Sequence, residues 1–241
     1  MQKEHLFAMG HKNITIWEQS IVKDIETLLN NNSTTYLLDL GCGSGKWSIL
    51  VSNFINNEKQ NILAFDISRE EVSEANLRCN HTTEYILADG TIIPVKDKVF
   101  NTILVIAVLH HLLDEQAFQR VLSEIRRVSN IGAKVLFVEN TSDNPLKNQL
   151  VRFWKLINRS DLHLHGFTST KLLEMIRANH FKILDCKYEN LFTVYFYTIL
   201  GYLGINPSSS IIASFIAIEE LLIAKGLSRF TATVHIVAEV H

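Results

Sequence analysis

The sequence predicts an α/β fold built on a doubly wound, mostly parallel sheet of seven strands. Short apolar runs alternate with helical patterns along most of the 241 residues, which is typical of parallel strands joined by helices. The first apolar run, residues 37–40, leads into three glycines that alternate with other residues, and a helical pattern resumes at Trp47. Strand, glycine turn and helix in this order are typical of the first unit of a nucleotide-binding α/β fold.

The remaining elements follow from apolar runs and from helical spacing. Seven runs are expected to form strands, the last of them antiparallel: 37–40, 61–68, 85–88, 101–106, 134–138, 180–188 and 231–240. Helices are expected between them at 47–54, 69–79, 114–128, 146–157 and 167–179. Ser68 is expected to cap the second of these helices, because Glu71 stands three residues later in a capping-box pattern.

Composition narrows the class of protein. The formal net charge is −2 and the chain has no basic block, so no nucleic-acid footprint is visible in its composition. Cys42, Cys79 and Cys186 are far apart and have no paired spacing, which favours a reducing compartment over a disulfide framework or a zinc site. No apolar secretory segment follows Met1. These features together predict a cytoplasmic protein.

The glycine spacing distinguishes between nucleotide ligands. A dinucleotide fingerprint needs glycine at position 46, where this chain has Lys46. The pattern here is Asp39-x-Gly41-x-Gly43-x-Gly45, with an acid before the first glycine. That acid suits a ligand with a cationic amino group better than a pyrophosphate.

This motif resembles motif I of the class I S-adenosylmethionine-dependent methyltransferases, which have a Rossmann-like sheet. The resemblance covers residues 33–188 and 229–241 and implies S-adenosylmethionine as cofactor. The cofactor-binding residues that it implies are Asp39, Gly41, Cys42, Gly43, Gly45, Asp66, Ile67, Asp89, Gly90 and Ala107.

Three strand tips are expected to contact different parts of this cofactor. Asp66, near the tip of the second strand, is placed to bind two ribose hydroxyls, and its alternative role is to cap the next helix or turn. By resemblance, Asp89 accepts a hydrogen bond from the adenine amino group, beside Gly90 and Thr91. Ile67 is then expected to cover one face of the adenine.

Two histidines follow the fourth strand. His110 or His111 could act as a base near neutral pH if the acceptor must lose a proton, and the alternative is that they support the next helix. Catechol-type methyltransferases place one metal-binding acid after the fourth strand and an acid–Asn pair after the fifth. Glu139-Asn140 resembles this pair, but the chain has Ala107 where the acid after the fourth strand would stand. The sequence therefore predicts no metal site.

Two segments that lie largely outside the range of the resemblance are predicted to be helical. Apolar residues between Ile14 and Leu29 recur at helical spacing, so residues 1–35 form either a helix packed on the sheet edge or a lid that uses His11, Lys12 or Trp17. Residues 189–228 form an apolar insertion, expected as a helical hairpin too short to span a membrane.

These observations predict a single methyltransferase domain over residues 1–241 that methylates a small or lipophilic acceptor at oxygen or carbon. Three alternatives are an RNA methyltransferase, a protein methyltransferase and a non-catalytic partner subunit with the same fold. No nucleic-acid partner is expected. The insertion at 189–228 could close over the acceptor, contact a membrane surface or join two copies of the chain.

Overall fold

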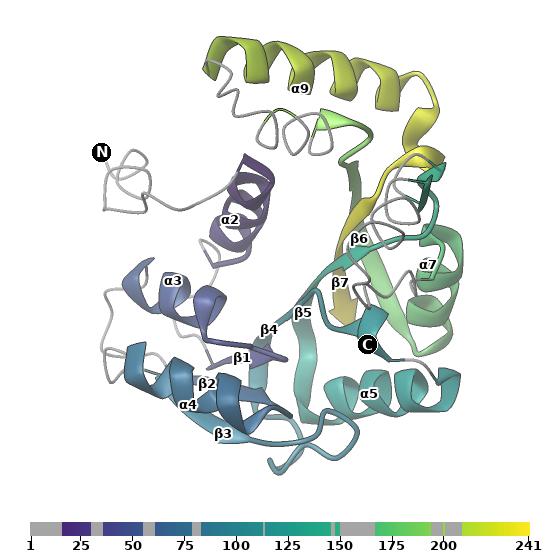
Figure 1. The fold of residues 1–241 in the computed structure, drawn as a ribbon. Helices are drawn as coiled ribbons and strands as arrows, with labels where there is room; N and C mark the ends of the chain where they lie inside the picture. The colour runs from purple at the N-terminus through teal and green to yellow at the C-terminus, as the bar shows by residue number, and fades with distance from the viewer. Residues whose placement is uncertain are drawn as a thin grey trace. The chain divides into compact units, whose positions relative to one another are not determined.

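The sheet predicted from the sequence is present. The structure is a computed structural model that describes residues 16–29, 36–54, 61–78, 83–112, 114–145, 148–149, 167–193, 200 and 209–241. Within this part of the chain, seven strands form one sheet in the order β3-β2-β1-β4-β5-β7-β6 (Figure 1). The sheet is mostly parallel and its last strands are antiparallel, as the sequence predicts.

The strands lie close to the predicted runs. Their bounds are β1 Tyr36–Leu40, β2 Asn61–Asp66, β3 Thr83–Leu87, β4 Phe100–Ile106, β5 Ser129–Asn140, β6 Phe181–Glu189 and β7 Thr233–Val240. The helices are α2 Ile16–Leu29, α3 Lys46–Phe54, α4 Arg69–Arg78, α5 Glu115–Val128, α7 Ser169–Ala178 and α9 Ser209–Ala224, with short 3₁₀ turns η1 Leu109–His111 and η2 Leu227–Phe230.

The start of β5 corrects one prediction. The fifth strand was expected at residues 134–138, yet β5 begins at Ser129. Near the start of β5, the side-chain amide of Asn130 donates to the carbonyl of Val99 at 3.2 Å, just before β4. Gly132 takes φ +79° within the strand, a backbone conformation that glycine adopts without steric cost.

The chain divides into two compact units. The first comprises the chain up to Ile106 with Arg120–Leu136 and Glu239–His241, and the second comprises Ala107–Gln119 and Phe137–Ala238. The expectation of a single domain over residues 1–241 stays a prediction.

In the first unit, β1 is central to the parallel strands. It pairs with β2 on one side and with β4 on the other, and Leu40 lies opposite both Phe65 and Val105. The carboxyl ends of these three strands therefore lie at one edge. The loops that follow β1 and β2 start at this edge, and this is where ligands bind in open parallel sheets.

Helix α2 belongs to the core of the first unit. Its buried apolar side chains form one stripe: Ile21, Val22, Ile25, Leu28 and Leu29. Glu18 of α2 is also buried and forms an ion pair with Lys46, the first residue of α3. The lid alternative depends on His11, Lys12 and the side chain of Trp17. All three fall outside the described residues, so the lid stays a prediction.

In the second unit, aromatic contacts join the strands and helices that follow β4. Phe137 of β5 and Phe181 of β6 meet edge to face with ring centroids 5.9 Å apart. Phe118 of α5 meets Phe167, just before α7, at 4.9 Å. Such edge-to-face pairs add about 0.5–1.5 kcal/mol beyond the burial of apolar area.

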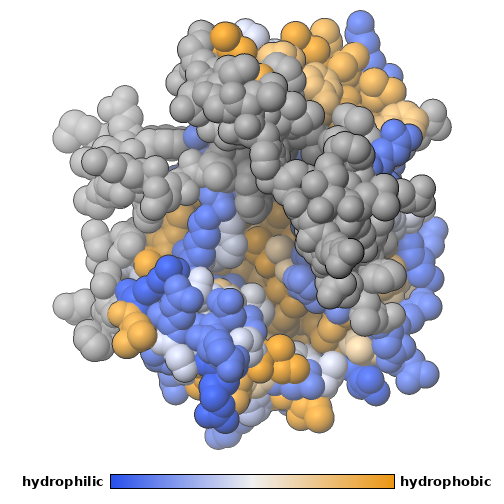
Figure 2. Space-filling view, viewed as in Figure 1, coloured by the Kyte–Doolittle hydropathy of each residue, from blue (hydrophilic) through white to orange (hydrophobic). Residues whose placement is uncertain are grey.

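The apolar insertion is described in part. The insertion contains two apolar runs, residues 191–203 and 211–224. The second run lies within helix α9, whereas most of the first falls outside the described residues. Ile211, Ile218 and Leu221 of α9 are exposed, and Figure 2 shows apolar residues of this helix at the surface, at the top of the view. None of the helices that the structure describes is long and apolar enough to cross a membrane.

Candidate functional site

The glycine turn, residues 41–45, links β1 to α3 and is tied to the end of β2. The backbone N–H of Cys42 donates to the carbonyl of Phe65 at 2.9 Å. One residue later, the N–H of Gly43 donates to Oδ2 of Asp66, also at 2.9 Å. The strand tip predicted to hold the ribose thus also fixes the shape of the turn.

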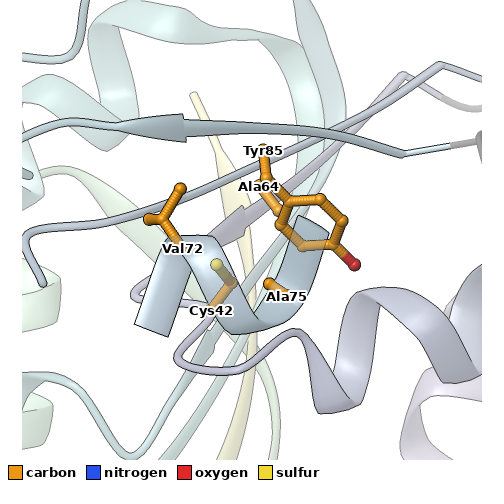
Figure 3. Close-up of a cluster of buried hydrophobic side chains, with 5 residues drawn as sticks. All are labelled: Cys42, Ala64, Val72, Ala75 and Tyr85. Atoms are coloured by element: carbon orange, nitrogen blue, oxygen red, sulfur yellow. The ribbon is translucent and has the colours of Figure 1, made fainter. Parts of the chain in front are cut away.

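Close packing explains why position 45 is glycine. A Cβ atom there would lie 2.8 Å from the Tyr85 hydroxyl and 3.0 Å from Cβ of Ala75, and the residue has φ +80°. Figure 3 shows the surrounding cluster, in which Tyr85 of β3 and Val72 and Ala75 of α4 gather near Cys42. Gly45 therefore lets the start of α3 approach α4 and β3 closely.

Position 43 is open by contrast. A Cβ atom on Gly43 would meet only the carboxylate of Glu71, at 3.5 Å, and that is ordinary van der Waals contact. The backbone of Gly43 also has a positive φ, of +52°. The space beside Gly43 therefore leaves its backbone open to a ligand, and its contact with the cofactor stays a prediction.

Asp39 is buried beneath the turn. Its Oδ2 accepts the N–H of Ser48 at 3.0 Å and so supports the first turn of α3. Burial raises the pKa of Asp39 to about 7; hydrogen bonds from Ser48 oppose this rise and the charge of Asp66 adds to it. A nearby cation would favour the ionised form of Asp39.

Cys42 lies in the same acidic surroundings. Its thiol is buried, and burial together with the charges of Asp39 and Asp66 raises its pKa well above the usual value. The side chain is therefore an inert part of the cluster, and Cys42 can contribute to a ligand site through its backbone.

Asp66 supports the turn before α4, the alternative role that the sequence left open, and its contact with the ribose stays a prediction. Its Oδ1 accepts the N–H of Ser68 at 2.9 Å while Oδ2 accepts that of Gly43. Ser68 caps α4 as predicted, since its hydroxyl accepts the N–H of Glu71 at 3.2 Å. The reciprocal half of the capping box is replaced by Asp66, which takes the Ser68 N–H that Glu71 was expected to bind. Each oxygen of Asp66 keeps a lone pair for a ligand hydroxyl.

The tip of β3 carries a tight polar turn. Oδ1 of Asp89 accepts both the N–H and the hydroxyl of Thr91, each at 2.8 Å. A Cβ atom added at Gly90 would lie 3.6–3.8 Å from side chains of Val121, Leu40 and Phe65, which is ordinary contact. Ile67, at the tip of β2, exposes 73% of its surface. The adenine contacts expected of Asp89 and Ile67 stay predictions.

The second unit holds the two histidines. Nδ1 of His110 lies 2.9 Å from Oε2 of Glu139, a side chain that is almost fully buried at the end of β5. The rings of His110 and His111 lie 4.1 Å apart between centroids. The sequence indicated the two histidines as candidate bases, but it did not indicate Glu139 as the partner of His110. The one feature that could have indicated this contact is the acid at the end of the fifth strand.

Ala107 is held in a strained conformation in the same unit. It has φ +60°, which is unusual for a residue with a side chain, and its N–H donates to the carbonyl of Val138 at 2.8 Å. The predicted contact of Ala107 with the cofactor stays a prediction, as do the roles of the other predicted site residues. Among the described residues, no group of three or more side chains could hold a metal ion.

Comparisons with known proteins find methyltransferases among the relatives of this chain. A family model described as a methyltransferase domain matches residues 37–132. A malonyl-[acyl-carrier protein] O-methyltransferase from Marinomonas sp. is 26% identical over 191 residues, which cover 76% of this chain and 66% of that protein. A demethylmenaquinone methyltransferase from Listeria monocytogenes is 27% identical over 130 residues, which cover 51% of this chain and 52% of that protein.

Residues 37–132 belong to a methyltransferase domain family, and the relatives support a class I S-adenosylmethionine-dependent methyltransferase. This methyltransferase chain also shares its fold with a crystal structure of a SAM-dependent methyltransferase from Methanosarcina mazei. The TM-score is 0.62 at 18% identity, and the match covers 90% of this chain and 96% of that one. The family and its cofactor, S-adenosylmethionine, are as predicted. The methyltransferase chain covers less than two thirds of the length of the two curated relatives named above.

Proposed function

We propose that this chain transfers the methyl group of S-adenosylmethionine to a small or lipophilic acceptor, at oxygen or carbon. The observation that carries the proposal is the group of carboxylates around the glycine turn. Asp66 binds the turn directly, Glu71 lies beside Gly43, and Asp39 lies beneath. Their charges favour a cationic ligand and disfavour a pyrophosphate, and S-adenosylmethionine carries a sulfonium and an ammonium group.

Residues at the ends of β2 and β3 bind different parts of the cofactor in this proposal. Asp66 would accept hydrogen bonds from two ribose hydroxyls, Asp89 would accept one from the adenine amino group, and Ile67 would cover the ring. When bound, S-adenosylmethionine supplies a methyl group on a positively charged sulfur. Much of the rate of such a transfer comes from alignment of donor and acceptor, so rigid strand tips suit this reaction.

Two observations support a small or lipophilic acceptor. The names of the relatives point to an acyl-carrier conjugate in one case and a quinone precursor in the other. Helix α9 exposes apolar side chains, including Ile218 and Leu221, and is thus suited to an apolar molecule. A net charge of −2 speaks against an RNA acceptor, since binding phosphates requires clustered cations.

Calorimetry and labelled methyl transfer test the proposal together. The purified chain should bind S-adenosylmethionine and S-adenosylhomocysteine and should not bind NAD. Incubation with methyl-labelled cofactor and extracts of cell lipids and metabolites, followed by mass spectrometry, should give a labelled small molecule. Binding of NAD without binding of S-adenosylmethionine would refute the cofactor assignment. Binding without any labelled product would instead favour a non-catalytic partner subunit.

A further inference from the structure

The buried carboxylate of Glu139 contacts four nitrogen atoms of the segment that follows β4. Its Oε1 accepts the N–H groups of Val108 and Leu109 at 2.9 and 2.8 Å, and its Oε2 lies 3.3 Å from the N–H of His110. The same Oε2 lies 2.9 Å from Nδ1 of the His110 ring. One side chain on β5 therefore fixes both the backbone of η1 and the imidazole that η1 carries.

This arrangement determines which ring nitrogen carries the hydrogen. An ionised carboxylate only accepts hydrogen bonds, so the hydrogen between the two groups belongs to Nδ1 of His110. In the neutral ring, Nε2 is then an acceptor with a free lone pair. No described residue is recorded in a hydrogen bond with Nε2, and the His110 side chain keeps 17% of its surface exposed.

We propose that Glu139 is a positioning residue that holds His110 as a general base acting through Nε2. The acceptor that such a base suits, within methylation at oxygen or carbon, carries a hydroxyl that must lose its proton, as in a phenol, an enol or a quinol. A carboxylate acceptor is already ionised at neutral pH and needs no base. This inference rests on the proposed methyl transfer and narrows its acceptor class.

The proton and electron movements balance for such an acceptor. Nε2 of His110 takes the hydroxyl proton, and the imidazolium that forms is stabilised by the carboxylate of Glu139 on its other side. The electron pair released on the acceptor, at oxygen or at a conjugated carbon, forms the new bond to the methyl carbon. The bond from that carbon to the cofactor sulfur breaks with its electron pair on sulfur. The proton leaves His110 to solvent after the reaction.

Few other titratable groups contact this base. Among the described residues, those recorded against the His110 ring are Glu139 from β5 and His111 from its own 3₁₀ turn. A change in the pH dependence of the reaction on substitution of Glu139 can therefore be assigned to this group of three side chains.

The tautomer of His110 tests the positioning role without cofactor or acceptor. Nitrogen NMR of the histidine-labelled chain should show hydrogen on Nδ1 of neutral His110. Glu139→Leu, which offers no acceptor, should allow the Nε2–H form to appear, and Glu139→Gln should lie between the two. A wild-type ring with its hydrogen on Nε2 would overturn the proposal, and this measurement stands even if the Leu variant does not fold.

A matched control distinguishes an effect of Glu139 on the His110 ring from the stabilisation that any buried carboxylate gives to backbone N–H groups. Glu219 of α9 is also a buried carboxylate, and it accepts the N–H groups of Leu191, Phe192 and Thr193 at 2.8–3.1 Å. Glu219→Gln should lower stability as Glu139→Gln does, yet it should leave the His110 tautomer unchanged. An equal effect of both variants on the tautomer would mean that Glu139 has no specific role.

Activity then tests the acceptor class. The labelled product should carry its methyl group on a hydroxyl oxygen or on a carbon conjugated to a hydroxyl. His110→Gln should lower kcat at neutral pH by roughly 100-fold or more with little change in KM, and Glu139→Gln by roughly 10-fold, with the loss shrinking at high pH. Methylation of a carboxylate would overturn this inference and leave the proposed function intact, whereas methylation of an amine would overturn this inference and also the assignment of the methyl group to oxygen or carbon. Cofactor binding with no product would overturn the proposed function, while the tautomer still decides the role of Glu139.

Discussion

At the scale of single residues, carboxylates shape the glycine turn before any ligand is present. Asp66 binds one backbone N–H on each side of its own strand tip, and these contacts fix Gly43 and Ser68 relative to each other. Asp39 is buried below and bound to α3. Side chains fixed in this way lose little freedom on binding a ligand, so they can bind it more tightly than mobile ones.

Substitution of Asp66 should weaken the cofactor complex. Asp66→Ala removes a charge-assisted contact to two hydroxyls, so we expect a loss on the order of 2–3 kcal/mol of binding free energy, measured by calorimetry. Asp66→Asn keeps one acceptor oxygen and should lose less. Ser68→Ala is the control, because it removes the cap of α4 and spares the carboxylate. If Asp66→Ala binds cofactor like the parent, Asp66 only supports the turn.

Asp39 should make stability fall as pH rises. Its folded pKa of about 7 exceeds the ordinary value of 3.8, so the folded state binds the proton more tightly, and stability is lost between about pH 4 and pH 7. Asp39→Asn removes the buried charge and should be more stable than the parent at pH 8, by at most about 4 kcal/mol, and equal near pH 4. Denaturant unfolding at both pH values measures the difference. A parent as stable as the variant at pH 8 would contradict this account, and weaker cofactor binding by Asp39→Asn would show that the charge is kept for the ligand.

At the scale of elements, the start of α3 depends on close packing against α4 and β3. Tyr85 spans the two contacts, since its hydroxyl lies 3.0 Å from that of Ser48 in α3 and its ring packs in the cluster with Ala75 of α4. The turn therefore cannot shift outward without disturbing this cluster. The positions of the strand tips and of the helix N-terminus are thus fixed by packing in the first unit.

Gly45→Ala should destabilise the chain more than the same substitution at another glycine with the same backbone conformation. Gly132 has φ +79°, close to the +80° of Gly45, but nothing lies within 4 Å of a Cβ at Gly132. Gly132→Ala should cost about 1–2 kcal/mol for the left-handed backbone alone. Gly45→Ala adds the clash with Tyr85 and should cost about 1–3 kcal/mol more, measured by denaturant unfolding. Equal losses for the two variants would mean that the cluster yields without strain.

Helix α9 reverses the usual distribution of polarity. Glu219, one of its two charged residues, is buried, whereas Ile218 and Leu221 expose about half of their surface. A helix that packs only on its own core would show the opposite arrangement. The exposed side chains are therefore suited to contact an apolar molecule, and the role of the insertion at 189–228 stays a prediction.

Replacing both Ile218 and Leu221 with Ser should raise the KM for an apolar acceptor roughly tenfold and leave cofactor affinity unchanged. Partial loss of two apolar contacts is worth about 1–2 kcal/mol, which corresponds to about that factor. Ala217→Ser, a control on an exposed position of the same helix, should have no effect. An unchanged KM accompanied by dissociation of a dimer would instead assign this face to contacts between copies of the chain.

At the scale of the whole molecule, all strand tips predicted to bind the cofactor except Ala107 belong to the first unit. Binding should therefore stabilise that unit directly. S-adenosylhomocysteine at 100 times its dissociation constant should raise the free energy of unfolding by about 2.7 kcal/mol. Hydrogen exchange should slow at residues 41–45, 66–68 and 89–91 and stay unchanged in α9. Slowing confined to α9 would place the ligand elsewhere.

Local patterns in the sequence were sufficient to predict the sheet, the glycine turn and the family. Apolar runs, glycine spacing and capping residues act over a few positions, so they can be recognised without knowledge of distant contacts. The strands at β1 and β2 and the cap at Ser68 were predicted for this reason. The distinction between adenosylmethionine and a dinucleotide also rests on local spacing, on Lys46 in place of a glycine.

Other features depend on residues that are distant in sequence, and only the tertiary structure decided them. Glu139 lies 29 positions from His110, and no local pattern indicates that one fixes the other. The role of Gly45 depends on Tyr85, and the second contact of Asp66 depends on Gly43. The burial of Glu219 likewise depends on backbone N–H groups 26–28 positions earlier in the chain. A buried polar group needs partners wherever the fold supplies them, and the fold brings those partners together only after the chain has packed.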